Sequence, residues 1–451
     1  MAASSGDLVR ESDSGVSVRV PGDKSLTQRA LILAALCDGE SRLSGLLHGG
    51  DAESTAGALR ALGVGIPKLP VDGSEISVRG VGLGGLRPAG DGLDFGNSGT
   101  GARLLLGALA GSGISTRLVG DPSLQARPMT RVTDPLTRMG ASFVFLGQAG
   151  RLPIEITGRR PLRSLDWPSP VASAQVKSAI LLAGLTGGAP VSITEPRQSR
   201  DHTERMLKGL GVSVDSRMTE AGWRVEMLTP PEKTSAFDFA VPGDLSSAAF
   251  VFALAALSRD SSRAVTVEGV GLNPTRTAFL DVLKRMGARV EVSMRASRSG
   301  TVSGTVGEPV GDVTVSCSGL RGTSVSGMEI PRLIDELPLV AVLGARAEGV
   351  TRISGAAELR AKESDRIEAL VSNLRGLGVE VEEFEDGLEV KGTDRPLSGF
   401  VSSYGDHRIT MSFGVLGYSD SCDIEVGDPE TADVSFPGFW GVVDQVVATQ
   451  S

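Results

Sequence analysis

The sequence repeats itself across its midpoint, and this repeat most constrains what the chain can fold into. Residues 20–23 read VPGD, and the same four letters return 221 positions later at residues 241–244. The segments that follow also match, as the apolar stretches KSLTQRALILAAL at 24–36 and LSSAAFVFALAAL at 245–257. Because a repeated start is followed by a repeated element, we predict two related halves.

Each half divides again into three units. Apolar helices with small or polar starts recur near residues 24, 97, 173, 245, 335 and 406. A short β-branched strand follows each of them, as in PVSITE at 190–195. A more amphipathic helix then ends on a glycine, as in LRALGV at 59–64 and LKRMGA at 283–288, which is typical of a helix C-terminus. We therefore predict an α/β protein of two domains, each with three βαβαββ repeats.

Two segments rich in glycine, at 80–92 and 295–309, are interpreted as hairpin connections between paired strands. The first of them contains no GxGxxG motif that opens a helix, so no dinucleotide site is expected.

Composition narrows the class of protein. The 451 residues carry a net charge of −9, which argues against a nucleic-acid coat and against a polybasic membrane surface. Three cysteines and three histidines without a CxxC pair make a structural metal site or a disulfide framework improbable. No leader or long apolar run of about 18 residues is found. We expect a cytoplasmic protein that binds neither nucleic acid nor membrane.

The first repeated helix carries cations at its start. Helix N-termini present free N–H groups and a partial positive charge, so Lys24, Ser25 and Arg29 could converge on a phosphate or a carboxylate. The alternative is an ordinary cap by Asp23 or Ser25, with solvated cations. The fourth helix start, at residues 245–247, lacks the lysine and the arginine. The architecture therefore does not require them, which favours the functional interpretation.

Polar groups also mark other element starts. The second start, FGNSGTGAR at 95–103, offers open amides and Asn97, or is a glycine-rich cap. The third offers Ser173, Gln175 and Lys177, as a polyhydroxylated anion would need. Arginine suits bidentate contact with phosphate or carboxylate. Three of the amphipathic helices have an arginine at their starts, and each of these could otherwise be an exposed surface residue: Arg127, Arg200 and Arg366.

Acids are concentrated in the second half. Carboxylates that face cations are the usual equipment for moving a proton on and off a substrate. The candidates are Asp335, Glu363, Asp365 and Asp406. Asp335 or Glu336 could instead only cap the helix that begins there.

Together these stretches resemble the 5-enolpyruvylshikimate-3-phosphate (EPSP) synthase family over essentially the full length. The motifs are PGDKSLTQRA, GNSGTGARLL, ARPMTRV, ASAQVKSAILLAGL, RDHTERML, IDELP, KESDRI and DHRITMS. The resemblance implies an inside-out α/β barrel in each of two domains, with the active site in the interdomain cleft. The domains would be 23–241, and 1–22 together with 242–451.

The resemblance also implies a reaction that needs no metal or organic cofactor. Phosphoenolpyruvate would pass its enolpyruvyl group to the 5-hydroxyl of shikimate-3-phosphate through a tetrahedral ketal, with release of phosphate. By similarity, shikimate-3-phosphate would be held by Lys24, Ser25, Arg29, Ser173, Ala174, Gln175, Arg200, Asp335 and Lys362. Phosphoenolpyruvate would be held by Lys24, Asn97, Gly99, Arg127, Gln175, Arg366 and Arg408. Asp335 would accept the hydroxyl proton, and Glu363 with Lys24 would exchange protons at the methylene group.

One position departs from the family pattern. Many members have a lysine just before the final [ST]-F-P, where this chain has Val434. His407 in the DHR motif is interpreted as a hydrogen-bonding support. The sister enolpyruvyl transferase, which acts on UDP-N-acetylglucosamine, usually carries a reactive cysteine in a mobile loop, whereas Cys37 falls within an apolar helix here. A repeat protein that binds polyanions without catalysis would spread cations over all six units. We expect a monomer.

Overall fold

The computed structural model describes residues 9–12, 15–258, 260, 264–295, 303–304, 307–317 and 319–450. The contacts divide the chain into two compact units. The N-terminal unit is Gly22–Val241 with Ser297–Glu308, and the C-terminal unit is Met1–Pro21, Pro242–Ala296 and Pro309–Ser451. Within the described ranges, no helix has the length and apolar character to cross a membrane.

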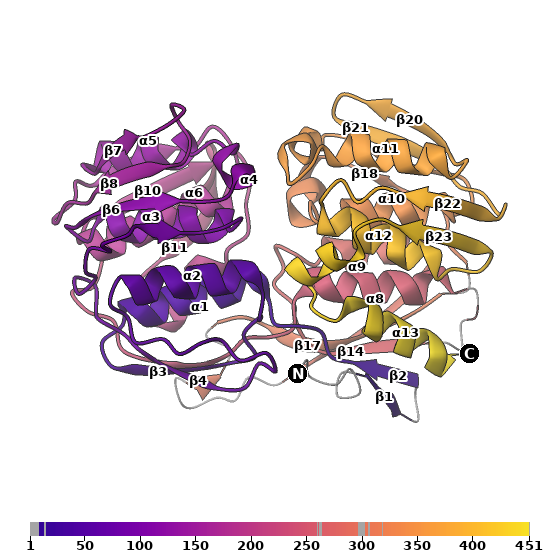
Figure 1. Cartoon of the computed structure of the whole chain (residues 1–451), viewed down its shortest axis with the longest axis horizontal. Helices are drawn as coiled ribbons and strands as arrows, with labels where there is room; N and C mark the ends of the chain where they lie inside the picture. Colours follow the sequence, from indigo (N-terminus) through magenta and orange to yellow (C-terminus); the bar gives the residue numbers. More distant parts are fainter. Residues whose placement is uncertain are drawn as a thin grey trace. The chain divides into compact units, whose positions relative to one another are not determined.

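Three buried helices form the centre of the N-terminal unit (Figure 1): α1 (Lys24–Leu36), α3 (Gly99–Ala110) and α6 (Ala174–Gly187). Beyond their first turns, nearly all of their residues are buried. A helix that is apolar all round can lie only in an interior, so the sequence itself requires the central position. Their side chains make one continuous hydrophobic core for this unit.

Three four-stranded sheets cover these helices and share one plan. A short strand pairs in parallel with the strand that follows the buried helix, and that strand pairs antiparallel with a later one. In spatial order the sheets are β16 (Ser303–Gly304), β13 (Asp238–Ala240), β3 (Glu40–Ser44) and β4 (Ile76–Arg79); β5 (Leu93–Asp94), β6 (Ser115–Val119), β8 (Ile154–Thr157) and β7 (Ser142–Phe145); and β9 (Leu165–Pro168), β10 (Val191–Glu195), β12 (Gly222–Met227) and β11 (Asp215–Thr219).

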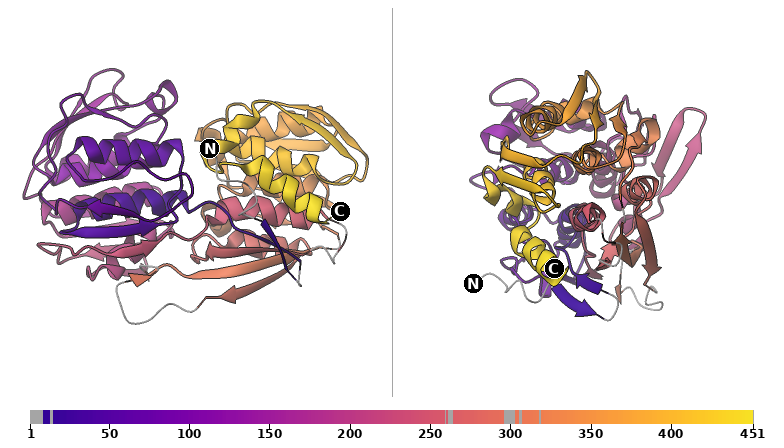
Figure 2. Two further views of the ribbon diagram at one scale, coloured as in Figure 1. Left: turned by 60° about the horizontal axis from the view of Figure 1, so that its bottom comes forward. Right: turned by 90° about the vertical axis from the view of Figure 1, so that its right-hand side faces the viewer.

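The C-terminal unit follows the same plan around α8 (Leu245–Leu257), α10 (Leu337–Ala345) and α12 (His407–Gly417). The end-on panel of Figure 2 shows its helices along their axes with strands outside them. Its sheets are β1 (Val9–Ser12), β2 (Gly15–Val18), β14 (Val265–Gly271), β17 (Val310–Ser316) and β15 (Arg289–Met294); β18 (Ser324–Val325), β19 (Val350–Ile353), β21 (Gly387–Lys391) and β20 (Glu380–Phe384); and β22 (Leu397–Val401) with β23 (Cys422–Val426).

The amphipathic helices lie against the sheets from outside the buried triplets. They are α2 (Gly50–Ala61), α5 (Thr130–Met139), α7 (His202–Gly209), α9 (Ala278–Arg285), α11 (Arg366–Gly376) and α13 (Phe439–Gln450), with a short α4 (Pro122–Gln125) before α5. The predicted glycine stops are confirmed, because all five have positive φ after the last turn: Gly63, Gly140, Gly211, Gly287 and Gly378.

One predicted hairpin connection is wrong. The segment 80–92 joins β4 to β5, which belong to different sheets, so it crosses between units of the repeat. Its first residues instead close the end of α1, where the N–H of Val81 donates to Ala35 O and that of Gly82 to Cys37 O. A Cβ on Gly80 would lie 2.1 Å from Cys37 O, which explains the glycine there. The segment 295–309 does join two strands of one sheet, β15 and β17, although most of it falls outside the described residues.

Candidate active site

The first turns of α1, α3 and α6 lie together in the N-terminal unit. Three side-chain hydrogen bonds join them pairwise: Gln28 Nε2 to Ser98 Oγ (2.8 Å), Gln175 Nε2 to Thr100 Oγ1 (2.9 Å) and Arg29 Nη2 to Ser178 Oγ (3.1 Å). The partial positive charges and free N–H groups of three helix starts therefore gather in one region. Such a region favours a bound anion.

Asp23 caps the N-terminus of α1, whereas Lys24, the next residue, forms an ion pair. Asp23 accepts a hydrogen bond from the N–H of Leu26 at 2.9 Å, so the capping interpretation holds for Asp23. The Nζ of Lys24 lies 2.7 Å from Oδ2 of Asp51 on α2, and the lysine side chain is 21% exposed. Lys24 is thus held in place by a carboxylate but can still be reached from solvent.

Arg29 is buried on the same helix. Its Nε donates to Thr203 Oγ1 at 2.8 Å and its Nη1 donates to Ser25 O at 3.0 Å. Burial lowers the pKa of Arg29 to about 10 against the opposing effect of the Glu204 carboxylate, and the nearby charge of Arg200 lowers it further. The positive charge of Arg200 therefore acts against that of Arg29.

Asn97, Gly99 and Arg127 lie at the start of α3. Arg127 Nη2 donates to Asn97 Oδ1 at 2.6 Å, and Asn97 Nδ2 donates to Asp121 Oδ2 at 2.9 Å. A Cβ added to Gly99 would lie 2.9 Å from Arg103 Nη1 and 3.3 Å from Arg127 Nη1. The space beside Gly99 is therefore bordered by two guanidinium groups.

Arg103 is a contributor that sequence reasoning missed. Its guanidinium is buried and donates from Nη1 to Gln175 Oε1 at 2.9 Å and from Nη2 to Pro128 O at 3.3 Å. Together with the hydrogen bond from Gln175 Nε2 to Thr100, the Arg103 contact fixes the orientation of the Gln175 amide against α3. The available signal was its place in the GNSGTGAR motif, one helical turn after Gly99.

Ser173 and Ala174 begin α6, with Ser173 as its cap. The proposed ammonium contact from Lys177 is wrong, because its side chain is 0% exposed. Its Nζ lies 3.1 Å from Glu195 Oε2 and 2.8 Å from Glu204 Oε1. Burial disfavours the ammonium ion, but these two carboxylates more than offset this and raise the pKa of Lys177. No substrate can reach it in this conformation.

In the C-terminal unit, Arg366 gathers three carboxylates. It begins α11 with a side chain only 1% exposed, so it is not an exposed surface arginine. Its Nε donates to Asp406 Oδ2 at 2.8 Å and its Nη2 to Glu363 Oε2 at 2.7 Å. Its Nη1 lies 3.6 Å from Asp335 Oδ1. Three of the four candidate acids of the second half thus share one guanidinium, whereas the fourth, Asp365, caps α11 and pairs with Arg360 at 2.9 Å.

The charges in this cluster stabilise one another. Burial disfavours the cation, but the carboxylates of Asp406, Glu363 and Asp335 raise the pKa of Arg366. Burial likewise disfavours the Asp406 carboxylate, yet Arg366 holds the pKa of Asp406 below its usual range. The side chains of Asp335 and Glu363 remain 21% and 28% exposed, so both can meet a ligand.

The capping alternative for Asp335 is not observed. Glu336 occupies the cap position of α10 without a side-chain cap hydrogen bond, and it accepts a hydrogen bond from Ser246 Oγ instead. Asp335 lies one residue earlier and faces the buried guanidinium described above. Lys362 is held more loosely, with Nζ 3.4 Å from Glu358 Oε1.

Arg408 is the second residue of α12. Its guanidinium lies 5.7 Å from the ring centre of Phe250, and among the described residues its side chain makes no hydrogen bond or ion pair. It is therefore a cation with donors to spare. His407 next to it is buried, and Val434 at the end of a 3-10 turn (Pro429–Val434) is 41% exposed.

The fourth helix start is not bare, contrary to the sequence interpretation. Arg276, which precedes α9, is buried there and donates from Nη2 to Asp244 Oδ1 at 3.0 Å and to Ser246 Oγ at 2.7 Å. Asp244 caps α8 as Asp23 caps α1. The two starts differ because Arg276 is enclosed by its own unit, whereas Lys24 keeps exposed surface.

Comparison with known proteins places these features in one family. A family model described as EPSP synthase (3-phosphoshikimate 1-carboxyvinyltransferase) matches residues 12–443. The 3-phosphoshikimate 1-carboxyvinyltransferase of Desulforamulus reducens is 46% identical over 432 residues, which are 96% of each chain. That of Gloeobacter violaceus is 46% identical over 424 residues, 94% of each chain. The chain belongs to the EPSP synthase family.

Solved structures agree with this membership. The EPSP synthase of Acinetobacter baumannii superposes with a TM-score of 0.82 at 38% identity over 95% of both chains. The enolpyruvyl transferase NikO of Streptomyces tendae gives a TM-score of 0.71 at 19% identity, which shows a shared fold alone. The predicted two-part α/β architecture of the EPSP synthase family is thus confirmed for this chain.

Cys37 bears on the rival enolpyruvyl transferase with a reactive thiol. It follows the last residue of α1 and is fully buried. Burial raises the pKa of Cys37 to about 11. Since the thiolate is the reactive form, this cysteine is unsuited to that role, as expected for a member of the EPSP synthase family.

Proposed function

We propose that the chain transfers the enolpyruvyl group of phosphoenolpyruvate to the 5-hydroxyl of shikimate-3-phosphate, giving EPSP and phosphate on the route to chorismate. The observation that carries this proposal is the gathering of three helix starts with Lys24 and Arg29 in a chain of net charge −9 that belongs to the EPSP synthase family. Both reactants are anions, so fixed local cations are what the reaction requires.

In the N-terminal unit we assign seven residues to the binding of shikimate-3-phosphate: Lys24, Ser25, Arg29, Ser173, Ala174, Gln175 and Arg200. Support comes from Arg29, which contacts Ser25 on its own helix and is electrostatically coupled to Arg200. A cation whose pKa is lowered by burial and by a second cation gains stability when a dianionic phosphate arrives. From the C-terminal unit we assign Asp335 and Lys362 to the same substrate.

In the N-terminal unit we assign five residues to the binding of phosphoenolpyruvate: Lys24, Asn97, Gly99, Arg127 and Gln175. Support comes from the hydrogen bond between Arg127 and Asn97 and from the Arg103 contact that orients Gln175. From the C-terminal unit we assign Arg366 and Arg408. Arg408 is the better donor, because Arg366 is already held by three carboxylates.

The chemistry needs an acid, a base and stabilised charge. Protonation of the methylene carbon makes the adjacent carbon electrophilic, and the hydroxyl adds there as it loses its proton. We assign that proton to Asp335, and we assign the exchange at the methylene group to Glu363 and Lys24. Loss of a proton and of phosphate from the ketal then restores the double bond. Arg366 keeps Asp335 and Glu363 oriented.

A phosphate-release assay tests the proposal. Purified chain is mixed with phosphoenolpyruvate and either shikimate-3-phosphate or UDP-N-acetylglucosamine as acceptor. We expect phosphate only with shikimate-3-phosphate. Release with the nucleotide sugar alone would reassign the acceptor, and no release with either would refute an enolpyruvyl transferase.

The cellular setting is also part of the proposal. We propose that the protein is cytoplasmic. We also infer a monomer, because the described residues supply a hydrophobic core to each unit without a second chain. Light scattering of the purified chain should give a mass near 46.6 kDa. Twice that mass would replace the monomer with a dimer.

A further inference from the structure

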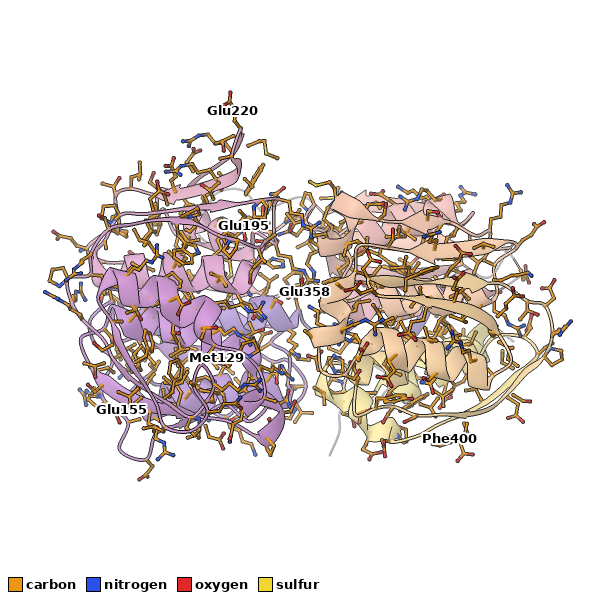
Figure 3. All side chains as sticks on the ribbon, turned by 90° about the horizontal axis from the view of Figure 1, so that it is seen from above. Met129, Glu155, Glu195, Glu220, Glu358 and Phe400 are labelled. Carbon is orange, nitrogen blue, oxygen red and sulfur yellow. The ribbon has the colours of Figure 1, made fainter. Side chains whose placement is uncertain are left out.

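A fully buried charge cluster lies beneath the start of α6. It consists of Lys177, Glu195 and Glu204, whose side chains are at most 2% exposed. Figure 3 labels Glu195 among the packed side chains, in contrast with Glu220, which projects from the turn between β11 and β12. Burying three charged groups is costly unless they are paired. Apolar side chains could fill the same space without this cost, so stability alone does not explain why the chain has charged residues here.

Glu195 connects this cluster to two neighbouring segments of the chain. Its Oε1 accepts from the backbone N–H of Ser173 at 2.7 Å. Both of its oxygens accept from Ser199 Oγ, at 2.9 and 2.8 Å, and Oε2 also lies 3.4 Å from the N–H of Ser199. One carboxylate thus ties Ser173 at the start of α6 to the residue immediately before Arg200.

Lys177 contacts both Glu195 and Ser199. Its ammonium lies 3.1 Å from Glu195 Oε2 and donates to Ser199 O at 3.4 Å. It compensates the buried carboxylate while that carboxylate binds several donors at once, which a neutral amide could not do. Glu204 contacts the same ammonium at 2.8 Å, but no hydrogen bond joins it to Ser173 or Ser199.

We propose that Glu195, held by Lys177, is a positioning residue for shikimate-3-phosphate: it sets the spacing between Ser173 and Arg200. This inference rests on the proposed function, which assigns both of those residues to that substrate. The phosphoenolpyruvate residues Asn97 and Arg127 are instead positioned by a hydrogen bond to each other and by one from Asn97 to Asp121, so the effect should fall mainly on one substrate.

The test compares the same substitution at each of the two glutamates that contact Lys177. Glu195→Gln keeps one acceptor oxygen but cannot accept from both Ser173 and Ser199 in the observed way. Glu204→Gln removes the same charge from the same cluster without touching either residue. Loss of such a supporting hydrogen bond typically costs about 10- to 100-fold. We expect this rise in the KM for shikimate-3-phosphate in Glu195→Gln, with the KM for phosphoenolpyruvate within about threefold.

Glu204→Gln should leave the shikimate-3-phosphate KM unchanged or lower it, because a negative charge near Arg29 is lost. Equal changes in the two variants, or a Glu195→Gln effect on both substrates alike, would overturn the positioning role and leave a structural one. Calorimetric titration with shikimate-3-phosphate alone should reproduce the difference. A parent chain without phosphate release refutes the proposed function, whereas an active parent with an unaffected Glu195→Gln refutes only this inference.

Should Glu195→Gln fail to fold, Ser199→Ala provides the second test. It removes the Oγ donor and leaves all three buried charges in place. We expect a rise of about threefold to tenfold in the shikimate-3-phosphate KM, as for one hydrogen bond to a charged group. An unchanged KM would overturn the inference.

Discussion

Replacing Lys24 with methionine should remove activity while the fold persists. The backbone accepts an apolar side chain at this place, because Leu245 occupies the matching position after a cap of nearly the same conformation, with ψ of 120° at Asp244 and 119° at Asp23. Loss of one group that stabilises developing charge typically costs about 10²–10³ in kcat. A second role at the methylene proton places the expected loss at about 10³ or more.

The same substitution leaves Asp51 without its cation. The pair has side chains 21% and 11% exposed, so it is neither a surface pair nor a fully buried one. Exposed pairs contribute about 0–1 kcal/mol, and breaking a buried pair costs about 3–5 kcal/mol, so we expect about 1–3 kcal/mol. In a unit of this size that lowers Tm by roughly 2–4 °C per kcal/mol. Melting should therefore shift down but stay cooperative.

A matched control separates the two effects. Asp51→Asn removes the carboxylate that needs compensation, so the double variant with Lys24→Met should regain most of the lost Tm. It should remain inactive, since no cation has returned. The assays are phosphate release and thermal melting on all four proteins. A Lys24→Met variant with kcat within tenfold of the parent would refute the role of Lys24, whatever its Tm.

Three further predictions follow from single residues. Asp335→Ala should lower kcat by about 10²–10⁴ with a smaller change in the phosphoenolpyruvate KM, and a retained kcat would reduce Asp335 to a structural partner. Gly99→Ala should weaken glyphosate, a phosphoenolpyruvate-like inhibitor, more than it weakens phosphoenolpyruvate, because the methyl group fills the space beside the phosphoenolpyruvate site, 2.9 Å from Arg103 Nη1 and 3.3 Å from Arg127 Nη1; a cost of about 1–3 kcal/mol is expected, and an unchanged ratio of inhibition constant to KM would contradict it. Cys37, whose pKa is raised to about 11, should resist alkylation at pH 8 until the chain unfolds. Its protonated form stabilises the native state, so this contribution should be lost as the pH rises from about 8.5 towards about 11; rapid labelling of native Cys37 by mass spectrometry would be the contrary result.

Much of the fold could be predicted because the chain repeats a strong pattern. The apolar helices and the strands after them were found from periodicity, and the glycine stops located the ends of the outer helices. The short parallel strands were not found, since β5 (Leu93–Asp94) and β18 (Ser324–Val325) have two residues each and show no alternation. The crossing segment at 80–92 was misread because glycine content does not say which strands a loop connects.

The site was harder to predict than the fold. A sequence shows which cations exist but not which are already paired, and the partners of Lys177 come 18 and 27 residues later. A signal was present, because α6 is apolar all round and offers a lysine no exposed face. Arg276 was missed for the same reason, since it reaches the fourth helix start from a neighbouring element.

The most direct test of the account is phosphorus NMR of the purified chain with phosphoenolpyruvate and shikimate-3-phosphate. The account predicts that the phosphoenolpyruvate signal falls as inorganic phosphate rises in equal amount, while the phosphate ester of the acceptor persists at the shift of the EPSP product. Lys24→Met should leave the spectrum unchanged over the same period. Hydrolysis of the acceptor ester, or phosphate release that does not depend on the acceptor, would contradict enolpyruvyl transfer.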